Sequence, residues 1–90
     1  MLLERGQYVE GLDVGTVEAF IRENRKDFSR EQRRAGLYLT VWLEGPSWHL
    51  VLTADNPYPP GPGRVFGLVR DRVPARKLAR SVLMLLSSRA

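Results

Sequence analysis

Two runs of alternating apolar and polar residues, separated by a short turn, constrain the fold of this 90-residue chain more than any other feature. The runs are LYLTVWLE at 37–44 and WHLVLTA at 48–54. Period-two alternation in aliphatic and aromatic residues is typical of strands with one buried face. The connecting residues EGPS predict a hairpin. We expect a four-residue loop there, because Pro46 at the second central position of a two-residue loop is unfavourable in the common turns.

The register of this hairpin follows from its apolar rows. A slip by one residue would turn one row to the opposite face, so only one register gives the sheet a single apolar face. That register pairs Leu43 with Trp48, Val41 with Leu50, and Leu39 with Leu52. It also places Trp42 directly across from His49 on the other face.

Helical patterns come before the hairpin. The segment 16–28 begins with Thr16, a favourable N-cap residue, and carries apolar residues at helical spacing among charged ones. It predicts an amphipathic helix. The following SREQ has the pattern of a capping box, with Ser29 as the cap and Gln32 three residues on. A short second helix is therefore expected, ending near Gly36, because glycine commonly follows a helix C-terminus.

A third strand and a final helix are expected after the hairpin. RVFGLV at 64–69 has the composition of a strand. The segment 73–88 has helical periodicity, with Asp71 as its expected cap and Pro74 suited to its first turn. The expected buried stripe of this helix comprises Ala75, Leu78, Ala79, Val82, Leu85 and Leu86. Residues 1–15 are expected to form an edge strand or an irregular arm.

The order of these elements, helix–three strands–helix, predicts the α+β class. A three-stranded antiparallel sheet buries its apolar face by packing both helices on it, which gives a two-layer sandwich. Residues 1–90 are expected to form one domain, since single domains commonly hold roughly 100–150 residues.

Composition argues against several classes of site. The chain has no cysteine, so it has no disulfide and no thiolate metal site, and His49 is its single histidine. The glycine-rich GPGRVFG lacks the spacing and the lysine of a phosphate loop. We therefore expect no catalytic residue, no cofactor and no bound metal. No apolar run approaches the roughly 20 residues that span a bilayer, and Glu4 interrupts the first apolar residues, so a cytoplasmic location is expected.

Charge is unevenly distributed along the chain. Residues 64–90 carry a net charge of +6, whereas residues 1–63 carry −2. Arg76, Lys77 and Arg80 lie outside the buried stripe of the last helix, so they either bind the phosphates of a nucleic acid or form a solvated helix face. Arginine outnumbers lysine by 12 to 2, a bias that fits a thermophilic or GC-rich source.

The sheet face opposite the expected helices is the first candidate site. Its candidate binding residues are Tyr38, Trp42, His49 and Val51. Proteins rarely leave a patch with this many apolar and aromatic residues exposed, so another surface is expected to pack on it. We expect that surface to belong to a second copy of the chain, in a homodimer. The alternatives are a docking site for another protein, a stacking platform for nucleic-acid bases, and an N-terminal arm that folds over the face with Tyr8 and Val9.

Four of the six prolines lie between Pro57 and Pro62, within the connection from the second expected strand to the third. Such a run favours polyproline II, a conformation that docks in aromatic grooves. Proline also stiffens a loop by lowering the entropy of the unfolded chain. Because the segment lies between two strands, a stiff crossover is the favoured interpretation and a docking segment is the alternative.

The element order across residues 16–88 resembles that of the double-stranded-RNA-binding domain. GPSWH resembles the Gly-Pro-x-His hairpin of that family, and ARKLAR resembles its basic helix start. The resemblance implies that His49 probes a minor groove and that Arg76, Lys77 and Arg80 grip phosphates. The sequence departs from the family pattern in three respects: the histidine lies one residue too far from Gly-Pro, the glycine-rich turn does not directly precede the basic helix, and the first helix is rich in acids.

Together these observations predict a small non-enzymatic binding or regulatory domain that acts through self-association or through contact with another protein. The alternative is a nucleic-acid-binding module that uses its basic C-terminal helix.

Overall fold

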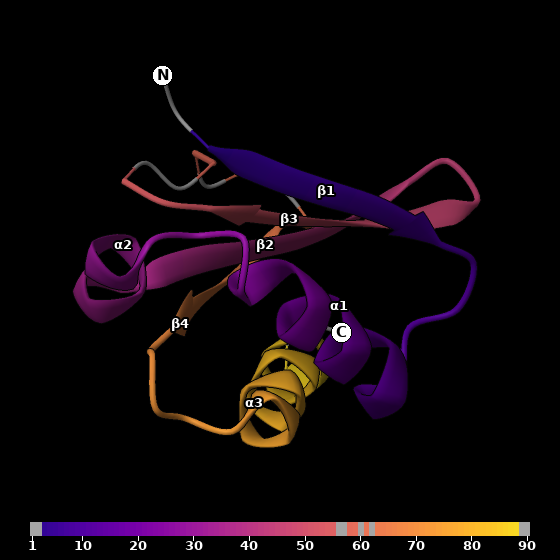
Figure 1. The fold of residues 1–90 in the computed structure, drawn as a ribbon. Helices are drawn as coiled ribbons and strands as arrows, with labels where there is room; N and C mark the ends of the chain where they lie inside the picture. The colour runs from indigo at the N-terminus through magenta and orange to yellow at the C-terminus, as the bar shows by residue number, and fades with distance from the viewer. Residues whose placement is uncertain (1–2, 56–57, 60, 62, 89–90) are drawn as a thin grey trace.

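The protein forms a four-stranded antiparallel sheet with its two longer helices packed on one side (Figure 1). The computed structural model describes residues 3–55, 58–59, 61 and 63–88. Its elements are β1 (Glu4–Val9), α1 (Val14–Arg25), α2 (Arg30–Ala35), β2 (Leu37–Glu44), β3 (Ser47–Thr53), β4 (Val65–Val69) and α3 (Ala75–Ser88). This architecture confirms the predicted α+β class. The sheet has one strand more than predicted, because β1 pairs with β3 as an edge strand.

The central hairpin has the predicted register. The observed pairs include Leu43 with Trp48, Val41 with Leu50, Leu39 with Leu52, and Trp42 with His49. The predicted four-residue loop is wrong: Glu44 pairs with Ser47, so only Gly45 and Pro46 form the turn. Gly45 has a φ of 63°, and a positive φ followed by the negative φ that proline imposes is the type II′ pattern. The glycine therefore makes a two-residue turn compatible with the proline.

The first helix begins earlier than predicted. Its N-cap is Asp13, whose Oδ1 accepts hydrogen bonds from the backbone N–H of Thr16 at 2.8 Å and from its hydroxyl at 2.9 Å. Thr16 is thus a donor to the cap and not the predicted cap, because a carboxylate is the stronger acceptor. The bond from the Thr16 backbone is the main cause that lowers the pKa of the Asp13 carboxyl. The capping box of α2 joins Ser29 and Gln32 as predicted, and Gly36 follows the helix with a φ of 103°.

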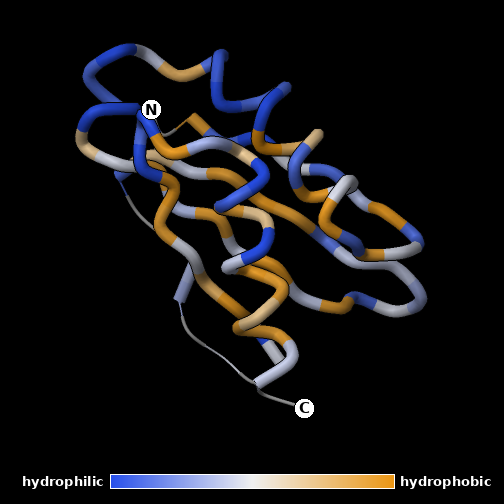
Figure 2. Tube along the Cα trace, turned by 90° about the horizontal axis from the view of Figure 1, so that it is seen from below, coloured by the Kyte–Doolittle hydropathy of each residue, from blue (hydrophilic) through white to orange (hydrophobic). Residues whose placement is uncertain are grey.

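The core lies between the sheet and the two long helices. Apolar residues recur along the strands and helices that enclose it (Figure 2). The largest fully buried side chains in this core include Phe20, Phe28, Ile21, Leu37, Leu39, Leu50 and Leu52. Burial of each side chain of this size contributes roughly 1.5–3 kcal/mol. The helix-covered face of the sheet therefore supplies most of the driving force for folding.

The buried stripe of α3 is shorter than predicted. Its buried residues are Ala75, Leu78, Ala79 and Val82. Leu85 is 44% exposed and lines a hollow together with Phe66 of β4, whose outer edge pairs with no strand among the described residues. Leu86 is partly buried and packs against the core. Asp71, the predicted cap of this helix, instead forms an ion pair with Arg33 at 3.6 Å.

The strand order β1-β3-β2-β4 requires two crossovers. The connection from β1 to β2 passes over β3, and the connection from β3 to β4 passes over β2. Both step in the same direction across the sheet, but β1 and β2 run opposite to β3 and β4. Crossovers in proteins strongly prefer one handedness. With these opposite strand directions, the two crossovers have the same handedness only if they pass opposite faces of the sheet. Because α1 occupies the first face, this preference assigns the connection from β3 to β4 to the second face, where its described residues Tyr58 and Arg64 contact Trp42.

Candidate functional site

The second face of the sheet, opposite the helices, carries three rows of side chains that run across the strands. The first row is Tyr8, His49 and Trp42; the second is Gly6, Val51, Thr40 and Phe66; the third is Glu4, Thr53, Tyr38 and Leu68. All four residues of the interface expected from the sequence, Tyr38, Trp42, His49 and Val51, lie on this face. The register brings them together with residues of β1 and β4.

Stacked rings join three strands in the first row. Tyr8 stacks on His49 with ring centroids 4.0 Å apart and an interplanar angle of 9°. His49 meets Trp42 edge-on at 4.6 Å and 66°. Aromatic pairs of this kind contribute about 0.5–1.5 kcal/mol beyond the area that they bury. The single histidine is therefore held between two rings, and it links β1 to β2 across β3.

The proline-rich connection covers this row. The ring of Tyr58 lies over Trp42 with centroids 5.3 Å apart, and the guanidinium carbon of Arg64 lies 4.7 Å from the Trp42 ring centroid. Arg64 Nη1 also donates a hydrogen bond to the Pro59 carbonyl at 3.0 Å. A cation–π contact contributes roughly 0.5–2 kcal/mol. These contacts agree with the predicted crossover. The prolines outside the described residues are Pro57, Pro60 and Pro62.

Residues of this connection, and not an N-terminal arm, lie over Trp42 on the second face, because β1 is itself a strand of the sheet. Val51 of the second row is completely buried and offers no surface to another chain. Thr40 and Thr53 are also buried, and their Oγ1 atoms have no hydrogen-bond partner among the described residues. A buried hydroxyl without a partner costs roughly 1–3 kcal/mol. These two hydroxyls therefore reduce the stability that burial on the second face provides.

Two carboxylates border the stacked rings. Glu44 Oε2 accepts a hydrogen bond from the Tyr8 hydroxyl at 3.2 Å. The same oxygen lies 3.3 Å from His49 Nδ1 as a close polar contact without hydrogen-bond geometry. Glu4 Oε1 accepts a hydrogen bond from the Tyr58 hydroxyl at 2.9 Å. Burial raises the pKa of both tyrosines, and their neighbouring carboxylates raise it further. Both phenols therefore remain neutral donors at neutral pH.

Exposed apolar side chains gather at the β4 edge of the sheet. Within the described residues β4 pairs only with β2, so its outer edge is open. Tyr38 stacks on Phe66 with ring centroids 5.5 Å apart, and it is the cross-strand neighbour of Leu68. Leu85 of α3 lines the same hollow as Phe66. Phe66 and Leu68 are 45% and 37% exposed, respectively. We call Tyr38, Phe66, Leu68 and Leu85 the β4 patch.

Sequence reasoning identified only Tyr38 of the β4 patch. Alternation within RVFGLV puts Phe66 and Leu68 on one face, and this signal could have found both residues. Tyr58 and Arg64 carried no such signal, because their contacts with Trp42 depend on where the chain crosses the sheet.

The basic residues of α3 lie partly within an ion-pair network. Arg76, Lys77 and Arg80 are all exposed. Arg76 Nη1 lies 3.2 Å from Glu18 Oε1 of α1, and Arg22 Nη2 lies 2.8 Å from the other oxygen of the same carboxylate. Glu18 therefore offsets part of the positive charge at the start of α3.

Other classes of site find no support in the part of the chain that the structure describes. It contains no group of three or more His, Asp or Glu side chains placed to hold a metal ion. No helix in these described segments is long and apolar enough to cross a membrane.

The chain matches no protein-family model, and no curated protein or solved structure shows significant similarity to it. The resemblance to the double-stranded-RNA-binding domain is therefore supported by no family match.

Proposed function

We propose that the protein is a non-enzymatic binding domain that forms a homodimer through the β4 patch. The observation that carries this proposal is an open strand edge bordered by exposed apolar side chains. Proteins commonly protect such edges with charged residues, proline, a bulge or a covering segment. The sequence of β4, VFGLV, contains neither a charged residue nor a proline.

A second copy of the chain fits this edge by symmetry. In an antiparallel pair of β4 strands related by a twofold axis at Gly67, Phe66 would face Leu68 of the second copy. The apolar rows of the second face would then continue from one copy into the other. The two sheets would form one continuous sheet, and neither β4 edge would remain open.

The charge of the chain opposes this association. Each copy carries a net charge of +4, and the pairing brings Arg64 opposite Arg70 of the second copy, where like charges repel. Salt at physiological strength screens exposed charges beyond about 8 Å. Dimerisation is therefore expected to strengthen as the salt concentration rises.

The surroundings of His49 support binding rather than catalysis. Its ring stacks on Tyr8 and meets Trp42 edge-on, which restricts the approach of a substrate. The nearby hydroxyls of Thr40 and Thr53 are buried, so they are not accessible as nucleophiles.

Sedimentation equilibrium of the wild type and two matched variants tests the homodimer. Phe66→Glu places a carboxylate in the β4 patch, and Leu43→Glu makes a comparable change at an exposed apolar site of β2 outside the patch. We expect dimers for the wild type and for Leu43→Glu, and a folded monomer for Phe66→Glu. A wild type that stays monomeric at high micromolar concentration and high salt would refute the homodimer. Dissociation of both variants would refute the β4 patch as its interface.

A further inference from the structure

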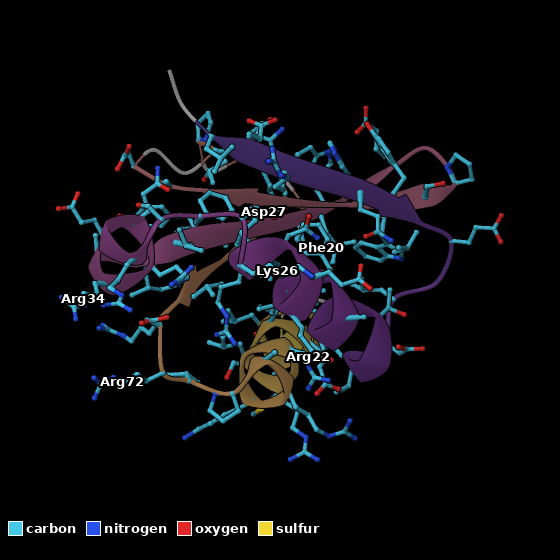
Figure 3. The ribbon with its side chains drawn as sticks, in the orientation of Figure 1. Phe20, Arg22, Lys26, Asp27, Arg34 and Arg72 are labelled. Atoms are coloured by element: carbon cyan, nitrogen blue, oxygen red, sulfur yellow. The ribbon has the colours of Figure 1, made fainter. Side chains whose placement is uncertain are left out.

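A cationic groove lies between the end of α1 and the turn that joins β4 to α3. It has a volume of about 500 Å³. Its charged lining residues, which define the arginine groove, are Arg22, Arg25, Lys26, Arg33, Asp71 and Arg72. Figure 3 shows the side chain of Arg22 on α1, that of Lys26 at the C-cap of this helix, and that of Arg72 on the turn. Segments far apart in the sequence thus contribute to one surface.

A second hollow, of about 450 Å³, adjoins the arginine groove, since Asp71 and Arg72 line both. It adds Arg34, which Figure 3 labels on α2, and Arg70. Together the two hollows present seven cationic side chains and one carboxylate, a formal charge of +6. The whole chain carries +4, so the remaining residues carry −2. Positive charge is therefore concentrated on this surface and not spread over the exterior.

Two arginines of the groove are held in place by backbone carbonyls, which do not neutralise them. Carboxylates partly neutralise two groove arginines, since Asp71 lies 3.6 Å from Arg33 and Glu18 lies 2.8 Å from Arg22. Arg25 Nη1 donates a hydrogen bond to the Val73 carbonyl at 2.9 Å. Arg33 Nη1 donates one to the Phe28 carbonyl at 2.7 Å. A guanidinium has five N–H donors, so each of these groups keeps donors for a further partner. The groove is therefore partly preorganised for an anionic ligand.

We propose that the arginine groove binds the phosphodiester backbone of a nucleic acid. Arginine binds phosphate oxygens through paired hydrogen bonds, and several arginines in one groove match a series of phosphates better than a single small anion. The charged lining argues against the apolar small molecules that most pockets hold. Because such contacts reach the backbone and not the bases, binding is expected to depend little on base sequence.

The start of α3 adds to the attraction. Val73 and Pro74 line the groove, and the helix begins at the next residue, Ala75. The positive end of the helix dipole therefore lies at the groove and favours anions there. This surface differs from the basic helix face that the sequence suggested, because most of its cations come from α1 and α2.

Fluorescence anisotropy with a labelled RNA duplex, and with the DNA duplex of the same sequence, tests the proposal. Lys26→Glu/Arg72→Glu reverses two exposed charges of the groove. The matched control, Lys77→Glu/Arg80→Glu, reverses two exposed charges of α3, so both variants have the same net charge. We expect the groove variant to lose at least about tenfold more affinity than the control. For about five phosphate contacts, wild-type affinity should fall roughly 10²–10³-fold between about 50 and 200 mM salt.

Each other outcome overturns the proposal. An equal loss in the two variants, with both shown to be folded by thermal melting, would assign binding to net charge alone. A larger loss in the control would move the site to α3. No binding of either duplex at about 50 mM salt would exclude the site, and equally tight binding of heparin would indicate a general polyanion surface. Since salt strengthens the proposed dimer and weakens phosphate binding, the two proposals fail separately.

Discussion

The two faces of the sheet are formed by alternate residues of the same strands, yet they are covered in different ways. On the helix face, Leu39 and Leu50 are fully buried against apolar side chains of the core. On the second face, Thr40 and Val51 are as deeply buried, but the segment on this side is the connection to β4, which places one ring and one guanidinium over the neighbouring Trp42. Residues of the two faces are therefore equally buried, but the elements that pack on them differ.

The difference reflects what a helix and a connecting segment can each do. A helix satisfies its own backbone hydrogen bonds and presents a continuous apolar stripe, whereas an irregular segment must find partners for its backbone groups one by one. The second face is consequently held by a few specific contacts, and the hydroxyls of Thr40 and Thr53 have no hydrogen-bond partner among the described residues. We expect it to be the less stable of the two faces.

The largest expected effect on stability comes from substitutions at two adjacent residues of β3 whose side chains point to opposite faces. Leu50→Ala should lower the free energy of unfolding by about 2–5 kcal/mol, because it leaves a cavity under the helices. Val51→Ala should cost less, about 1–2 kcal/mol, because it removes fewer carbons and the covering segment can settle into the space. Urea denaturation measures both values. A cost for Val51→Ala that equals that of Leu50→Ala would show that the second face is packed as rigidly as the first.

A pair of reciprocal substitutions tests the comparison of the two faces further, and we expect their effects on stability to be of intermediate size. Thr40→Val removes a buried hydroxyl without a partner and nearly keeps the volume, so it should stabilise the protein by about 1 kcal/mol. Val41→Thr introduces such a hydroxyl on the helix face and should destabilise by roughly 1–3 kcal/mol. Thermal melting resolves both, since 1 kcal/mol shifts Tm by about 4–8 °C in a domain of this size. A destabilised Thr40→Val would mean that the hydroxyl has a partner in solution.

The smallest expected effect on stability occurs only at alkaline pH. Burial of Tyr58, and then its hydrogen bond to Glu4, raise the pKa of the phenol above its ordinary value of 10.0. The neutral phenol is therefore favoured in the folded chain. Its contribution to stability is complete below the pKa of the unfolded chain and is lost as the pH rises through the higher pKa of the folded chain. The stability of the wild type should thus decline more steeply above about pH 10 than that of Tyr58→Phe, and parallel profiles would contradict this.

Local features of the fold could be predicted from the sequence. The hairpin register was predictable because Leu43 and Trp48 are close in the chain and the apolar rows admit one alignment. The α2 capping box was predictable because Ser29 and Gln32 form it between themselves. The cap of α1 was missed because Thr16 and Asp13 are both good cap residues, and only the structure shows which one accepts.

Features that depend on the path of the chain could not be predicted in this way. The cover over Trp42 requires knowing that the connection to β4 crosses the second face. The arginine groove draws cations from α1, α2 and the 70–73 turn, and a charge count along the sequence cannot show that these segments meet. Alternation assigned Val51 to the second face, but it could not show that the side chain is completely buried there.

The strand order also has a consequence for the time course of folding. The two hairpin strands are adjacent in the chain and lie in the middle of the sheet, whereas each edge strand must return across a neighbour to reach its place. Closing the connection 10–36 or 54–64 has an entropic cost before any edge contact forms. We therefore expect the hairpin to be native-like in the folding transition state and both edges to dock later. A partner that recognises β4 would then meet its complete surface only after the last strand has joined the sheet.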